Sequence, residues 1–103
     1  MKDKVDELIE VLNDVKARED ERHDAAMYLF EYDDPRVLDA FCKIGENENE
    51  LHVLLEAVGE GIGEIFSRNN QINLKKLNGL TNLSRDIAFE IIKLKNPRLL
   101  MNI

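Results

Sequence analysis

Apolar residues recur at intervals of three and four along almost the whole chain, which is the spacing of amphipathic α-helices. The first stripe predicts a helix over residues 2–16, and a charged break over residues 16–21 separates it from a second helix that stops before Pro35. Later stripes predict a third helix up to Gly45, a long helix that breaks at residues 69–70, a short helix before Gly79 and a final long helix. The stripes consist of Val5, Leu8, Ile9, Leu12 and Val15; Ala25, Ala26, Leu29 and Phe30; Val37, Leu38, Phe41 and Ile44; Leu51, Leu54, Leu55, Val58, Ile62, Ile65 and Phe66; Ile72, Leu74 and Leu77; and Leu83, Ile87, Ala88, Ile91 and Ile92.

Capping residues support these boundaries. Asp34 is a good N-cap and Pro35 a good first helical residue, so a helix is expected to start there. Thr81 or Asn82 caps the last long helix, and Asn96-Pro97 begins a final, truncated turn. The pattern predicts an all-α fold of about six or seven helices in a single domain over residues 1–103.

An internal repeat relates residues 23–38 to residues 85–100 at a constant offset of 62 residues, without a gap. A weaker copy lies between them, with Ala57-Val58 in the place of Ala25-Ala26. Half of the offset is 31 residues, the size of a two-helix unit. The identical pairs are Asp24/Asp86, Ala26/Ala88, Pro35/Pro97, Arg36/Arg98 and Leu38/Leu100.

This pattern resembles HEAT-like α-solenoid repeats. The resemblance is carried by Asp24-Ala25-Ala26, by Asp33-Asp34-Pro35-Arg36-Val37-Leu38-Asp39-Ala40 and by Asn96-Pro97-Arg98-Leu99-Leu100. It implies a short HEAT-like α-solenoid, with a capping helix over residues 1–18 and about two and a half helical-hairpin repeats over residues 20–103. HEAT repeats are usually somewhat longer, and the last repeat is cut short. An irregular helical bundle is the alternative.

Composition narrows the classes of function. The 103 residues carry a net charge of −7 and one cysteine, Cys42, which fits a reducing, cytoplasmic compartment. The charged start predicts no secretory signal, and the absence of an apolar run of about 18 residues predicts no membrane span. Net acidity argues against binding of nucleic acid, which requires Lys and Arg at the phosphates.

Acidic residues are concentrated in the first part of the chain: residues 1–60 carry 18 acidic and 7 basic side chains, and residues 61–103 carry 3 and 7. Glu56, Glu60 and Glu64 share one helix face, beside glycines at 59, 61 and 63. Asp33 and Asp39 lie near a turn between helices, with Glu48 and Glu50 at the next one. These five acids, Asp33, Asp39, Glu56, Glu60 and Glu64, are the expected partner-binding residues. Close helix packing, a helix break at the glycines and an ordinary solvated surface are the alternatives.

Catalytic chemistry has little support. His52 and Glu56 could share a face, but two ligands are too few for a metal site. His23-Asp24 is interpreted as a surface or capping pair, and Cys42 as a small buried apolar residue. The expectation is therefore no enzyme, no cofactor and no metal.

A small acidic HEAT-like protein is similar to the immunity proteins of contact-dependent growth inhibition. The resemblance implies that an acidic surface occludes the active site of a basic nuclease toxin, in a heterodimer in which this chain is a monomer. A scaffold or assembly subunit is the alternative, with the apolar tail as its contact. That tail, Leu99, Leu100, Met101 and Ile103, is expected to fold back on the domain.

Overall fold

The computed structural model describes residues 1–101, and all regular structure in that range is helical. The all-α class is therefore confirmed for these residues. The elements are α1 (Lys4–Asn13), α2 (Glu19–Leu29), α3 (Pro35–Gly45), α4 (His52–Asn69), α5 (Leu74–Asn78), α6 (Asn82–Lys95) and the 3₁₀ helix η1 (Pro97–Leu100).

Most predicted helix ends are confirmed, with their caps. The side chain of Asp34 accepts a hydrogen bond from the backbone N–H of Arg36 at 2.9 Å, and Pro35 is the first residue of α3. Thr81, rather than Asn82, caps α6 by accepting from the backbone N–H of Ser84 at 3.3 Å. Asn70 ends α4 in the left-handed region, with φ 53°.

The boundary between the first two helices differs from the prediction. Helix α1 ends at Asn13, where the extended Asp14 accepts from the backbone N–H of Lys16, so Val15 lies outside the apolar stripe and is 78% exposed. Helix α2 begins at Glu19, inside the segment predicted to be a break. Acidic side chains in its first turn favour this start because their negative charge interacts favourably with the positive, N-terminal end of the helix dipole.

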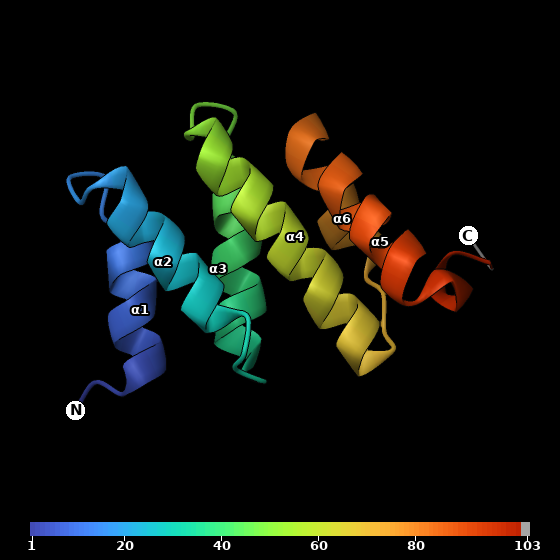
Figure 1. Cartoon of the computed structure of the whole chain (residues 1–103), viewed down its shortest axis with the longest axis horizontal. Coiled ribbons are helices and arrows are strands. Elements are labelled where there is room, and N and C mark those ends of the chain that lie inside the picture. The colour runs from blue at the N-terminus through green and yellow to red at the C-terminus, as the bar shows by residue number, and fades with distance from the viewer. Residues whose placement is uncertain (102–103) are drawn as a thin grey trace.

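The chain runs from α1 at one end of the long axis to α6 and η1 at the other (Figure 1). Helices α2, α4 and α6 lie next to one another in that order, while α3 packs behind them against α4 and α1 (Figure 1). Buried side chains from α1 through α6 form one hydrophobic core cluster, in which Leu12, Phe41 and Ile92 are fully buried. Helix α4 is central because it contacts α2, α3 and α6.

A buried ion pair fixes the start of α2 relative to the start of α4. The two terminal nitrogens of Arg22 donate to the two carboxylate oxygens of Glu50 at 3.0 and 2.9 Å, and its Nε donates to the Leu12 carbonyl oxygen at 2.9 Å. The side chains are 3% and 7% exposed. Burial would raise the pKa of Glu50, but hydrogen bonds from Arg22 and from the Leu51 backbone outweigh it, and the pKa lies below its usual value.

Arg36 connects the N-termini of α1 and α3. Its guanidinium donates to the carboxylates of Asp34, Asp6 and Asp3, at 2.6, 2.8 and 2.9 Å in the shortest contacts. Asp3 and Asp34 are also the N-caps of the two helices. The hydrogen bonds from Arg36 lower the pKa of Asp34 to about 2. One arginine thus stabilises two capping carboxylates.

The tail turns back onto the domain as far as it is described. Leu99 and Leu100 pack against the core cluster, and η1 contacts α6. Met101 is exposed, and Ile103 lies outside the described residues.

Candidate functional site: an acidic face of α2 and α4

Two of the five acids expected to bind a partner, Glu56 and Glu60, are exposed on α4 and form no ion pair within residues 1–101. The side chain of Glu64, one turn further along, is 27% exposed and forms a salt bridge with Lys95 of α6 at 2.6 Å. The shared helix face is therefore present, but its last carboxylate is already neutralised by a neighbouring helix.

Asp33 and Asp39 also have partners within the chain. Arg68 of α4 contacts Asp33 at 3.0 Å, and Lys76 of α5 contacts Asp39 at 3.4 Å. Asp39 lines a groove between α1 and α3 together with Ile9, and it is separate from the face that carries Glu56 and Glu60. The structure thus brings two of the five acids together as unpaired charges, and it distributes the other three among intramolecular salt bridges.

Close packing explains the glycines of α4, and the helix does not break at them. A Cβ atom on Gly59 would lie 2.6 Å from the backbone oxygen of Ser84, and one on Gly63 would lie 2.8 Å from that of Ala88. Gly61 faces the aromatic rings of Phe30 and Phe41 instead. Because these glycines are buried against α6 and the core, they leave no backbone free for a partner to approach.

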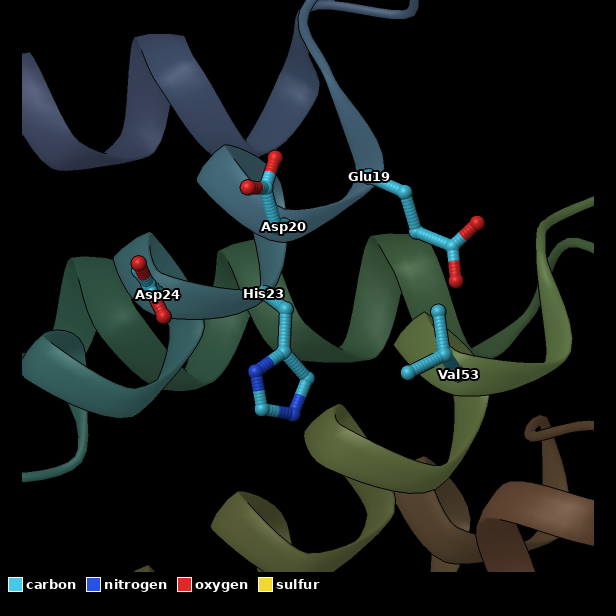
Figure 2. Close-up of a pocket in the computed structure, with 5 residues that line it drawn as sticks. All are labelled: Glu19, Asp20, His23, Asp24 and Val53. Carbon is cyan, nitrogen blue, oxygen red and sulfur yellow. The ribbon is translucent and has the colours of Figure 1, made fainter.

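A groove between α2 and α4 is the feature that sequence reasoning missed. It has a volume of about 480 Å³ and is lined by Glu19, Asp20, His23, Asp24 and Val53. Figure 2 shows His23 pointing from α2 into the space beside α4, with Glu19 reaching toward Val53 on one side and Asp24 on the other. The i, i+4 spacing of Glu19 with His23, and of Asp20 with Asp24, was the available signal.

The groove has free carboxylates at its edge. Asp20 contacts Arg18 at 3.3 Å, but Glu19 and Asp24 form no ion pair within the described part of the chain. Val53 is half-buried and packs against the hydrophobic core, so the base of the groove is apolar. With Glu56 and Glu60, these side chains form what we call the acidic face of α2 and α4.

The other reactive side chains support no catalytic arrangement. Cys42 is 5% exposed, and burial raises the pKa of its thiol to about 11, so the thiol is protonated near neutral pH. Residues 1–101 contain no group of three or more His, Cys, Asp or Glu residues placed to hold a metal ion. His52 and Glu56 are both exposed, with no third ligand beside them.

Comparisons with protein family models, with curated proteins and with solved structures find no match to this chain. Over residues 1–101, no helix combines the length and the apolar character that crossing a bilayer requires.

Proposed function

We propose that this chain is a non-catalytic binding protein whose acidic face of α2 and α4 engages a basic protein. The observation that supports it is the set of unpaired carboxylates on two adjacent helices, Glu19, Asp24, Glu56 and Glu60. By contrast, salt bridges within the chain already engage Asp33, Asp34, Asp39, Glu50 and Glu64. The four unpaired carboxylates can form ion pairs with a partner without first breaking an intramolecular salt bridge. They also accelerate association with a protein of opposite charge.

The proposed partner is a nuclease toxin, and the proposed role is that of an immunity protein. A nuclease holds its substrate with Lys and Arg side chains, because these neutralise the phosphates. The carboxylates of the acidic face would pair with those side chains and occlude the active site. Asp33, Asp39 and Glu64 would contribute less, since each must exchange an existing partner for a new one.

The architecture in this proposal is a HEAT-like solenoid. The two copies of the sequence repeat fall on α2–α3 and on α6–η1, with Pro35 and Pro97 each the first residue of the second helix. Ala26 and Ala88 occupy equivalent positions, and both are fully buried. A solenoid presents the helices of one layer as a continuous surface, which suits the side-by-side placement of α2, α4 and α6 (Figure 1).

Capture of the partner from the native cells tests this function. Tagged wild-type protein, Glu56→Lys/Glu60→Lys and the matched control Glu7→Lys/Asp86→Lys are used at low and high salt, and the bound proteins are identified. The control reverses two exposed charges on α1 and α6. We expect one basic protein with nuclease activity, held by the wild type and the control, lost from the α4 variant and released at high salt. Equal capture by the α4 variant would reject the acidic face as the binding surface.

A scaffold role is the second candidate, and exposed apolar residues near the C-terminal end favour it. Leu94 of α6 is 77% exposed and Met101 is 78% exposed. Partners held through these side chains would survive high salt, because apolar contacts are not screened.

A further inference from the structure

The groove between α2 and α4 places a histidine ring, an apolar base and carboxylates within one concave site. Glu19 and His23 are one helical turn apart and extend toward α4, where Val53 points back at Glu19 (Figure 2). Asp24 lies on the far side of His23 (Figure 2). A ligand entering the groove therefore meets exposed carboxylates at its edge and the half-buried imidazole and valine further in.

The Arg22–Glu50 ion pair holds the two walls of the groove in place. Arg22 precedes His23 on α2, and Glu50 lies two residues before α4 begins. Because both side chains are buried and joined by two hydrogen bonds, the spacing between the two walls is set before a ligand arrives. A preformed site loses less conformational entropy on binding than a mobile one.

We propose that this groove receives an arginine side chain of the protein partner. The inference rests on the proposed function and names the side chain that this face recognises. The charge of the free carboxylates selects a cation. The apolar base selects one with a long aliphatic stem, which would lie along Val53. The imidazole of His23 selects a planar head group, since a guanidinium stacks on aromatic rings and is less strongly hydrated than an ammonium.

Lysine fits the same groove less well. Its ammonium is a compact, strongly hydrated charge that gains little from a flat ring or an apolar wall. A metal ion is a poorer occupant still, because the described residues supply no cluster of three ligands here. A second copy of this chain, inserting one of its own arginines, is the remaining occupant and is distinguished by experiment.

Binding of short peptides to the full chain tests the proposal. The probes are acetylated, amidated tetra-arginine and tetra-lysine, measured by calorimetry and by amide chemical shifts. The variant is Glu19→Gln/Asp24→Asn, and the control Glu7→Gln/Asp86→Asn removes the same charge from exposed sites on α1 and α6. We expect tetra-arginine to bind the variant about tenfold more weakly than the wild type, and the control within about twofold. Its shifts should centre on residues 19–24 and on Val53, and tetra-lysine should bind several-fold more weakly.

Three results would overturn the proposal: equal loss of affinity in variant and control, equal affinity for the two peptides, or shifts spread over all acidic surfaces. Sedimentation provides a further test, since self-association that Glu19→Gln/Asp24→Asn abolishes would assign the groove to a second copy.

The capture experiment distinguishes failure of the arginine site from failure of the proposed function. If a nuclease is captured and the groove variant retains it, the function stands and the arginine site fails. If tetra-arginine occupies the groove and no nuclease is captured, the site stands and the toxin proposal fails.

Discussion

Removal of one member of the buried Arg22–Glu50 pair is predicted to be the most damaging charge substitution in this protein. Arg22→Met keeps an apolar chain of similar length but deprives the Glu50 carboxylate, 7% exposed, of the two hydrogen bonds from Arg22. It also removes the donor to the Leu12 carbonyl. An unpaired buried charge of this kind costs about 3–5 kcal/mol. That is a large fraction of the stability of a small domain, about 5–15 kcal/mol.

The double variant Arg22→Met/Glu50→Leu gives this prediction its control. With both charges removed, no buried charge is left unpaired, and the remaining loss comes mainly from the Leu12 carbonyl, about 1–3 kcal/mol. Urea denaturation followed by circular dichroism at pH 7 measures both free energies of unfolding. We expect the double variant to be more stable than Arg22→Met. If the single variant loses less than about 1 kcal/mol, or if the double variant is less stable than the single, an unpaired Glu50 carboxylate is not what destabilises Arg22→Met.

The same pair predicts a pH dependence with a definite sign. The pKa of Glu50 is lower in the folded protein than in the unfolded chain. Its contribution to stability is therefore complete above the pKa of the unfolded chain and is lost as the pH falls through the lower folded pKa. The wild type should therefore lose stability relative to Arg22→Met/Glu50→Leu as the pH is lowered from 7 to 3. A stability difference that is constant with pH would contradict this.

Three further predictions concern packing, capping and the thiol. Gly59→Ala should lower the free energy of unfolding, measured in urea, by about 1–2 kcal/mol, because the cost of overlap with the Ser84 backbone exceeds the gain in helix propensity. Its control, Gly79→Ala, meets only ordinary contacts and should leave the free energy of unfolding nearly unchanged. Thr81→Val should cost about 1 kcal/mol through loss of the α6 cap, and an unchanged urea midpoint would count against it. Cys42 should react with a thiol reagent only when the protein unfolds, so fast labelling in native buffer would be inconsistent with its burial.

Much of the helical framework could be predicted from local signals. Asp34-Pro35, Thr81, Gly45 and the Asn69-Asn70 break act within a few residues of themselves, and each marks a helix end in the structure. Val15 continued the apolar spacing of the first helix, but the turn at Asp14 removed it from the core. Periodicity alone does not show where a helix stops.

The candidate site depended on contacts between distant segments. Glu50 had the sequence context of a solvated turn residue, yet it lies buried against Arg22, 28 residues earlier. Glu64 had the same helical spacing as Glu56 and Glu60, but the position of Lys95 on α6 decided that it is paired. Glu19 and Asp20 fell in the segment interpreted as a charged break, and His23-Asp24 was interpreted as a surface or capping pair, because no local signal shows that Val53 packs beside them.

Under the proposed function, the acidic face of α2 and α4 neutralises a basic nuclease. The most direct measurement is inhibition of the captured nuclease by purified wild-type protein, by Glu56→Lys/Glu60→Lys and by the control Glu7→Lys/Asp86→Lys, on a labelled nucleic acid. We expect stoichiometric inhibition by the wild type and the control, and inhibition at least about tenfold weaker with the α4 variant. Equal inhibition by all three proteins, or none by the wild type, would contradict the proposed function.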